Sequence, residues 1–381
     1  MKKPQLISFY NEIKKTIQDY VTEISRHCRY KTLVAQMPEG CVLDDRSRLI
    51  DLYDTCLTQD AHLRACMETL YSYLTGDRYM LCIHSDDGKW ICDEEASKKI
   101  QGLEFEKIIH GILDACFYGY TLLYIDARPR EDTLLLNEVT IMERRNVLPA
   151  QHRVIKRQGQ WNPGWNLDSM QMRHSYVLVD SGDLGIYATT TPLVLAKKYT
   201  VANWVNFAHT YGQPIIHGRT GGEDHESRMR LAESIVNAAQ NRVVITGKDD
   251  EVDIKTFNTA ISEKLYYTLI EDYANKEMSN LILGSSSMAG EQQSYVGSTR
   301  VHENIFRERI KKYRIYVENV MNEQILPLFR YWNYIPENLM FKYSNNVDIP
   351  TEDKLKLFEL ILQHYDIDKN VLEKEFNVTL N

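Results

Sequence analysis

The segment from Gly218 to Gly222 is the first place where the residue types of this chain could do chemistry. It reads Gly-Arg-Thr-Gly-Gly, and glycines of this kind let a backbone approach a phosphate closely. The segment lacks the Gly-Lys-Ser/Thr ending of a P-loop, and the chain has no Gly-x-Gly-x-x-Gly motif and no Gly-x-Ser-x-Gly nucleophile elbow. We therefore interpret this segment as a surface turn.

Histidines and carboxylates near that turn could bind a metal, but their spacing does not match a known metal site. His217, Asp224 and His225 lie close in sequence without an His-Glu-x-x-His arrangement. The acidic groups Asp86-Asp87 and Asp249-Asp250-Glu251 could each attract a cation, although turns use such residues far more often to cap backbone N–H groups. The sequence predicts no catalytic residue, no metal site and no cofactor.

The stretch from Leu283 to Tyr316 indicates a different kind of function. A Gly, Ser and Gln run from Gly284 to Gly297 predicts a loop that is mobile unless a contact orders it. The helix expected after it has a basic face and an adjoining apolar stripe at helical spacing. The basic face consists of Arg300, Arg307, Lys311 and Arg314, and the apolar stripe of Phe306, Ile310, Tyr313, Val317 and Met321.

Composition places the chain among ordinary soluble proteins. Its 381 residues are 43% hydrophobic and 26% charged, and no run approaches the ~18 apolar residues of a membrane span. The net charge of −8 is opposite to that of a dedicated nucleic-acid binder, whose contact surface is basic. An acidic wall nevertheless suits a surface that lets DNA pass without holding its phosphates.

The first residues and the cysteines both favour a cytoplasmic protein. The N-terminal Met-Lys-Lys-Pro run is followed at once by polar and charged residues, without the apolar core of a signal peptide. The chain has 7 cysteines and no Cys-x-x-Cys pair, so we expect free, mostly buried thiols. These are Cys28, Cys41, Cys56, Cys66, Cys82, Cys92 and Cys116.

Several elements are expected before residue 190. A helix should end at Thr75-Gly76-Asp77, and a hairpin should run from Tyr79 to Ile91 around an Asp-Gly turn. A second helix should end at Tyr118-Gly119 and lead into a buried strand from Tyr120 to Asp126. Further strands are expected at Leu134 to Met142, Arg153 to Arg157 and Tyr176 to Val179, with an aromatic turn at Trp161 to Trp165.

After residue 190, two long helices bracket a small mixed segment. The first should begin at Pro192 and end at Tyr211, and the second should run from about Ala260 to Leu283. The segment between them should hold, in order, a strand at Ile215-Ile216, the glycine turn, a helix from about His225 to Ala239 and a strand at Val243 to Thr246. An acidic turn from Gly247 to Asp253 should follow.

Four stretches, in collinear order, resemble the portal proteins of Mu-like tailed phages. Asp60 to Met80 resembles an early helix of that family, and Phe117 to Ile125 resembles its Tyr-Gly-Tyr strand. Thr191 to Pro214 resembles its helix between a small-Pro-Leu start and a Gly-x-Pro stop. Leu283 to Asn304 resembles its loop and helix ahead of a Leu-Pro-Leu run. The resemblance covers most of residues 45 to 335.

The resemblance implies an α+β, portal-like fold that is mainly helical, with wing, stem and clip regions and small β elements. Residues 1–190 would form an N-terminal wing region, 191–212 the first stem helix, 213–256 the clip and 257–283 the second stem helix. Residues 284–297 would form the tunnel loop, 298–349 a long helix with the remaining wing, and 350–381 a small C-terminal crown.

The resemblance also implies roles for particular residues. The tunnel loop would line the DNA channel, the basic face would lie against a neighbouring subunit or DNA, and an acidic part of the clip would dock partners. The tunnel-loop residues are Ser285, Ser286, Ser287, Gln292, Gln293, Ser294 and Tyr295, the basic residues are Arg300, Arg307, Lys311 and Arg314, and the clip residues are Asp249, Asp250, Glu251 and Asp253.

The partners that the resemblance implies are those of a ring at one vertex of a phage capsid. They are further copies of the chain, usually twelve in all, the terminase large subunit, a head-tail adaptor, a major capsid or scaffold protein, and double-stranded DNA bound without sequence specificity. The ring would assemble in the host cytoplasm, without a membrane, and end in the virion. The alternatives are a DNA-processing enzyme with an unrecognised acidic site and a cytosolic helical scaffold.

Overall fold

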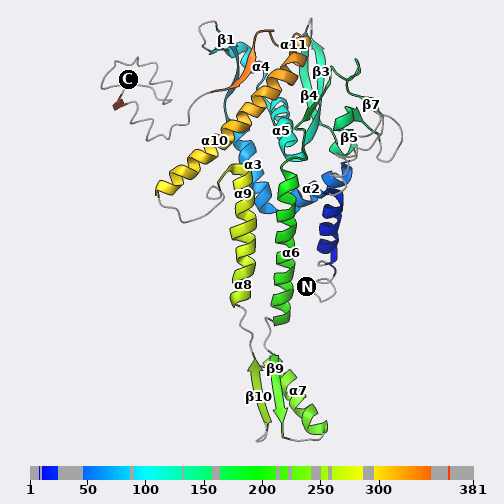
Figure 1. Ribbon diagram of the computed structural model, residues 1–381, viewed down its shortest axis with the longest axis vertical. Helices are drawn as coiled ribbons and strands as arrows, with labels where there is room; N and C mark the ends of the chain where they lie inside the picture. The colour runs from blue at the N-terminus through cyan, green and yellow to red at the C-terminus, as the bar shows by residue number, and fades with distance from the viewer. Residues whose placement is uncertain are drawn as a thin grey trace. The chain divides into compact units, whose positions relative to one another are not determined.

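The computed structural model describes residues 8, 11–24, 46–85, 90–130, 133–156, 164–211, 215–221, 225–241, 250–255, 260–285, 296–344 and 359–360. The chain divides into two compact units, Met1–Lys342 and Tyr343–Asn381. The first unit holds nearly all described elements and is mainly helical, with small antiparallel sheets (Figure 1). No helix among the described residues is long and apolar enough to cross a membrane.

Helices α2 (Ser47–Gln59), α3 (Ala61–Gly76), α4 (Glu94–Lys99) and α5 (Leu103–Tyr118) build the first half of this unit. Asp60 separates α2 from α3, and its side chain accepts a hydrogen bond from the Leu63 backbone N–H at 2.8 Å, which caps α3. Helix α5 ends where Gly119 adopts a left-handed φ of 90°. Both predicted helix ends, at Gly76 and Gly119, are confirmed.

The main sheet has the order β4-β3-β8 and is antiparallel throughout. Its strands are β3 (Tyr120–Arg130), β4 (Thr133–Ile141) and β8 (Tyr176–Asp180), so β3 is longer than the predicted Tyr120-to-Asp126 strand. Helix α5 packs against β3 so closely that a Cβ on Gly111 would clash with the Leu123 side chain. A second small sheet holds β5 (Val147–Leu148), β6 (Arg153–Val154) and β7 (Trp165–Asn166), and its β6 is shorter than the predicted Arg153-to-Arg157 strand.

The predicted hairpin is confirmed as β1 (Tyr79–His84) and β2 (Trp90–Asp93), and β11 (Met340–Tyr343) pairs with the other edge of β1. The expectation that all cysteines are free is wrong for two of them, because Cys82 and Cys92 form a disulfide. They lie directly opposite each other in the β1–β2 register. The spacing of Cys82 and Cys92 in the sequence does not by itself predict the disulfide, because it does not show that the two residues are opposite each other. The predicted Asp-Gly turn, midway between the two cysteines, is the feature that could have indicated it.

Helix α6 (Tyr187–Tyr211) corrects the predicted start at Pro192, because it begins five residues earlier and holds the proline inside it. An internal proline lacks the N–H that would bond to the carbonyl four residues back, here that of Ala188. The Tyr20 hydroxyl, from the helical segment 11–24, donates a hydrogen bond to that carbonyl at 2.7 Å. A distant side chain thus supplies the hydrogen bond that Pro192 removes.

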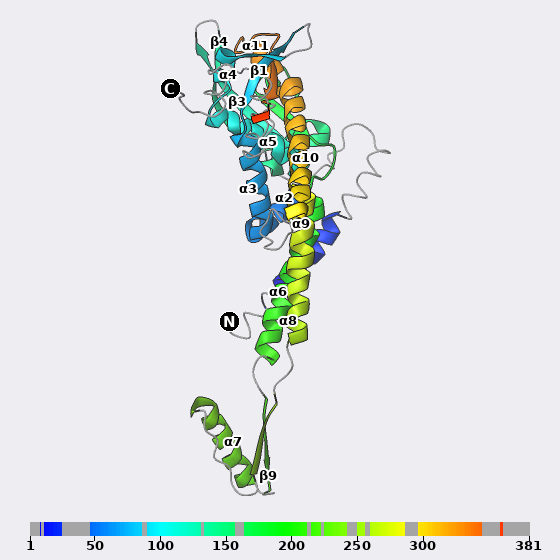
Figure 2. The ribbon, with the colours of Figure 1, turned by 90° about the vertical axis from the view of Figure 1, so that its left-hand side faces the viewer.

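The second predicted long helix is confirmed as a rod of three consecutive parts. These are α8 (Ala260–Tyr267), the π-helical turns η3 (Thr268–Asn275) and α9 (Lys276–Leu283). This rod lies side by side with α6 in both views, and Phe207 contacts Tyr266 with ring centroids 6.1 Å apart (Figures 1 and 2). We call α6 and this rod the stem pair.

Between the two helices of the stem pair, the chain forms a small sheet with one helix. Strands β9 (Ile215–Thr220) and β10 (Asp250–Lys255) are antiparallel, and α7 (His225–Asn241) packs on them through Leu231. The predicted helix is confirmed, whereas the glycine turn is corrected, because β9 extends through Gly218 to Thr220. The predicted strand at Val243 to Thr246 lies outside the described residues.

Helix α10 (Val296–Val320) continues through the π-helical turn η5 (Met321–Ile325) into α11 (Leu326–Tyr331). Its predicted apolar stripe is buried throughout. The stripe faces a core of large fully buried side chains from several elements. These include Tyr53, Phe105, Phe117, Tyr120, Tyr187, Phe329 and Phe341.

Candidate channel, docking and assembly surfaces

The predicted tunnel loop begins at the end of the stem pair. Gly284 terminates α9 in the left-handed conformation, with φ 81°, and the following Ser285 is buried within the single chain. Val296 and Gly297, which we expected in the loop, belong to the first turn of α10. The remaining residues predicted to line the channel lie outside the described part of the chain. They are Ser286, Ser287, Gln292, Gln293, Ser294 and Tyr295.

The predicted basic face of α10 has carboxylate partners within its own chain. Arg307 pairs with Glu303 at 2.7 Å, one turn away on the same helix. Arg314 pairs with Asp77, just beyond the end of α3, and both side chains are 23% exposed. The structure thus uses part of this face to join α10 to α3. Lys311 lies 3.9 Å from Glu308, and the side chain of Arg300 lies outside the described residues.

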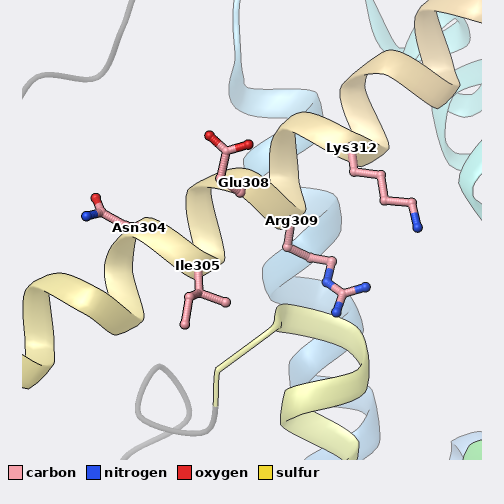
Figure 3. Close-up of a pocket in the computed structure, with 5 residues that line it drawn as sticks. All are labelled: Asn304, Ile305, Glu308, Arg309 and Lys312. Carbon is pink, nitrogen blue, oxygen red and sulfur yellow. The ribbon is translucent and has the colours of Figure 1, made fainter.

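A second face of α10, which the sequence analysis did not identify, borders a pocket of about 420 Å³ (Figure 3). Asn304, Ile305, Glu308, Arg309 and Lys312 line it. The end of α9 adjoins this face, because a Cβ on Gly284 would lie 3.2 Å from Ile305 Cγ2. Val301, Ile305, Arg309 and Lys312 are three or four residues apart, which is the spacing of one helix face, so the sequence alone could have identified this face. We call these four residues the outer stripe.

The acidic part of the predicted clip is a strand from Asp250 onward, which corrects the expected turn from Gly247 to Asp253. Val252 lies opposite Gly218, on the side that α7 covers, so alternation along the strands places Glu251 and Asp253 on the other side. Both residues are exposed, and Glu251 lies 3.8 Å from Arg219. Asp249 lies outside the described residues, as does the side chain of Asp250.

The candidate metal ligands near the glycine segment are not brought together as a cluster. His217 lies opposite Asp253 in the β9–β10 register, His225 begins α7, and Asp224 lies outside the described residues. Across the part of the chain that the structure describes, no three His, Cys, Asp or Glu side chains are grouped to hold a metal ion.

A polar joint connects the stem pair to α3. Lys197 of α6 pairs with Asp60 and donates to the Asn275 side chain, each at 2.8 Å. His62 Nε2 lies 3.0 Å from the Asn275 carbonyl oxygen, to which it donates, and 2.8 Å from Ser279 Oγ. Burial, together with the nearby Lys197 ammonium, lowers the pKa of His62. A neutral His62 therefore suits this joint.

A second buried polar cluster holds α2, α3 and α5 together. Arg144 pairs with Asp114, and its guanidinium lies 4.1 Å from the ring centroid of Tyr118. Tyr71 also donates a hydrogen bond to Asp114, and Tyr118 donates one to Asp54 at 2.6 Å. Arg144 is 14% and Asp114 17% exposed, so this ion pair is largely withdrawn from water. Because these side chains are largely buried and bond to one another, we interpret the cluster as structural.

Comparison with known proteins identifies a family that matches most of the sequence. A family model described as the portal protein of Mu bacteriophage matches residues 50–378. No curated protein matches the sequence.

Three solved structures match the chain at low sequence identity, and two of them have a similar fold. A chain from the neck of an empty gene transfer agent particle has a TM-score of 0.58 at 12% identity, covering 92% of this chain and 98% of that chain. A chain from the virion of a native gene transfer agent particle has a TM-score of 0.58 at 11% identity, covering 93% and 99%. An HK97-family phage portal protein from Corynebacterium diphtheriae has a TM-score of 0.42 at 11% identity, covering 76% and 93%.

Proposed function

The chain belongs to the family of portal proteins of Mu bacteriophage, and from that premise we propose that its copies assemble into a closed ring around a DNA channel at one capsid vertex. The observation that carries this proposal is the family match over residues 50–378. A portal ring is a structural part of the particle, so we assign this chain no catalytic role. That match favours neither a DNA-processing enzyme with an unrecognised acidic site nor a cytosolic helical scaffold protein.

The proposed regions follow the described elements. The stem is the pair formed by α6 and the α8–η3–α9 rod, and the clip is the β9–α7–β10 segment within residues 213–256. The wing combines residues 1–190 with 298–349, and residues 350–381 form a small crown. The segment between the end of α9 at Leu283 and the start of α10 at Val296 is the proposed tunnel loop.

The chemistry of these regions suits DNA that moves through the channel without binding tightly to its wall. The loop offers neutral side chains such as Ser286 and Gln292, which contact phosphates briefly without the counterion release that gives lasting affinity. The net charge of −8 opposes retention of DNA by the rest of the wall. We propose that DNA passes without sequence readout, during both packaging and ejection.

The proposed partners are assigned to different surfaces. The exposed carboxylates of the clip, Glu251 and Asp253, face the terminase large subunit during packaging and a head-tail adaptor afterwards. The wing contacts the major capsid or scaffold protein. The ring is a dodecamer that assembles in the host cytoplasm and becomes part of the virion.

Negative-stain electron microscopy of the purified full-length chain, with light scattering after size exclusion, tests this function. We expect closed rings with a central hole and a mass of many subunits. Protein concentration and salt should both be varied. A folded chain that stays monomeric under every condition contradicts the proposal.

A further inference from the structure

Exposed apolar side chains mark two surfaces that the single chain leaves uncovered. On α10, the outer stripe leaves Val301 and Ile305 exposed beside the pocket of Figure 3. On the α8–η3–α9 rod, Leu265, Leu269 and Tyr273 recur every four residues and are 42% to 57% exposed. Glu277 continues this spacing, and we call these four residues the stem stripe. Exposed apolar stripes of this kind mark contact surfaces.

The two stripes carry opposite charges at matching ends. The outer stripe ends in Arg309 and Lys312, and the stem stripe ends in Glu277. Within the described residues, no ion pair engages any of these three side chains. Each stripe begins with apolar residues at its N-terminal end, so a parallel alignment places apolar side chains together and the cations beside Glu277. The antiparallel orientation would instead place the cations beside apolar side chains, so the charges favour the parallel one.

The stripes also agree in length. Val301 to Lys312 and Leu265 to Glu277 each span roughly 16–18 Å at the helical rise of ~1.5 Å per residue. An offset of one turn places Arg309 opposite Glu277, with Lys312 on the following turn; Ile305 then lies opposite Tyr273, and Val301 opposite Leu269. In this register the Tyr273 ring would meet the pocket of about 420 Å³ beside Ile305.

We propose that the outer stripe of one subunit docks on the stem stripe of the next subunit in the ring. The inference rests on the proposed function, and it names which surfaces form the contact. Because the two stripes are different surfaces of one chain, each subunit offers one to each neighbour. A head-to-tail contact of this kind closes into a ring when its rotation permits closure.

Paired cysteines test the contact directly. The variants Ile305→Cys and Tyr273→Cys should each give few disulfide-linked dimers alone, because the two positions come from different stripes. Mixed before assembly and oxidised, they should give dimers, and the double variant should give a ladder of larger species on a non-reducing gel. The wild-type chain measures the background from its native cysteines.

The same gel separates the alternatives. A cross-link within one chain, seen as a faster-migrating monomer of the double variant, would mean that the pocket belongs to an intrachain contact. Rings that appear by electron microscopy without the mixed cross-link would overturn this inference and leave the proposed function intact. A wild-type chain that forms no rings would instead contradict the proposed function.

Charge reversal provides an independent test that depends on the charged ends. Lys312→Glu should raise the protein concentration needed for ring formation about five- to tenfold, because it places like charges together at every contact. Adding Glu277→Lys should restore assembly. The matched control is Lys312→Glu with Glu323→Lys, which restores net charge at an exposed position of η5 outside the stem stripe. Equal rescue by both second changes would show that only net charge matters and would contradict the pairing.

Discussion

At the scale of single residues, the polar contacts that matter most join elements far apart in sequence. Arg144 meets Asp114, Lys197 meets Asp60, and Arg314 meets Asp77. Each of these pairs is more buried than pairs such as Arg64 with Glu68, which are solvent-exposed. Breaking a withdrawn pair leaves a charge without water or partner, whereas exposed pairs contribute ~0–1 kcal/mol.

Asp114→Asn should therefore be strongly destabilising. The change leaves the Arg144 guanidinium without its carboxylate while keeping a polar group near the Tyr71 hydroxyl. We expect the free energy of unfolding to fall by about 3–5 kcal/mol in urea denaturation. The control Glu68→Gln, at an exposed pair on α3, should change it by less than about 0.5 kcal/mol. Equal effects of the two changes would mean that the cluster is not a structural centre.

The polar joint should make stability depend on pH through His62. Its pKa is lowered in the folded chain, so the unfolded chain binds the proton more readily. Stability from neutral His62 is therefore complete above its unfolded pKa of about 6.5 and is lost as the pH falls below that value. Lys197, Asp60 and Glu271 are the charged groups near the ring.

Urea denaturation of the wild type and His62→Gln at pH 7.5 and 5.5 measures this contribution. The wild type should lose more stability between the two values than the variant, because the titrating carboxylates are common to both. A variant with the same or a larger loss would contradict the assignment.

At the scale of elements, the segment between the stem helices should be separable from the rest. Among the described residues, β9 pairs only with β10, and α7 packs on that pair, so the segment has its own small core. Replacing residues 215–255 by a short Gly-Ser linker should leave the fold of the remaining chain intact. Circular dichroism and thermal unfolding should show one cooperative transition near the wild-type temperature.

The deletion should abolish binding to the terminase large subunit, which is measured by co-purification. The point variant Glu251→Lys with Asp253→Lys provides a milder version that keeps the sheet. Loss of the cooperative transition in the deletion would mean that the segment belongs to the main core.

Prediction from the sequence succeeded where one local rule decided the element. Gly76 and Gly119 end helices as expected, and the strands on either side of the Asp-Gly segment pair as a hairpin. It failed where contacts with residues far away in the sequence determined the structure. Pro192 sits inside α6 because Tyr20 supplies a hydrogen bond to the Ala188 carbonyl, a contact between residues 168 positions apart. The partner of Arg314, Asp77, is 237 positions away, and helical periodicity carries no information on such a pair.

For the candidate surfaces too, features within one helix could be predicted from the sequence, whereas contacts between distant residues could not. Periodicity found the basic face and the buried stripe of α10, because each is visible within a single helix. It did not show that the basic face pairs within its own chain, which leaves the other exposed side of α10 for a neighbour. For the tunnel loop, composition predicts a lack of apolar burial. Helix α9 ends at Leu283 as expected, whereas α10 begins at Val296, within the predicted loop.

At the scale of the whole molecule, the tunnel loop should be needed for DNA handling but not for assembly. The stem pair and α10 form without it, because their contacts come from α3, α5 and α6. Removing residues 286–293 should therefore leave ring formation unchanged by light scattering and electron microscopy. Replacing the same residues by a Gly-Ser segment of equal length is the matched control, because it keeps the chain length and changes the side chains.

Packaging then separates the roles of loop length and loop chemistry. If the loop forms a polar collar, its shortening widens the narrowest point of the channel, and particles should package or retain less DNA than the wild type. The equal-length replacement should retain more DNA than the deletion, because brief contacts with small neutral groups need little chemical specificity. The yield of protected full-length DNA per particle measures both variants. Full-length packaging by the deletion at normal yield would show that residues 286–293 do not line the channel.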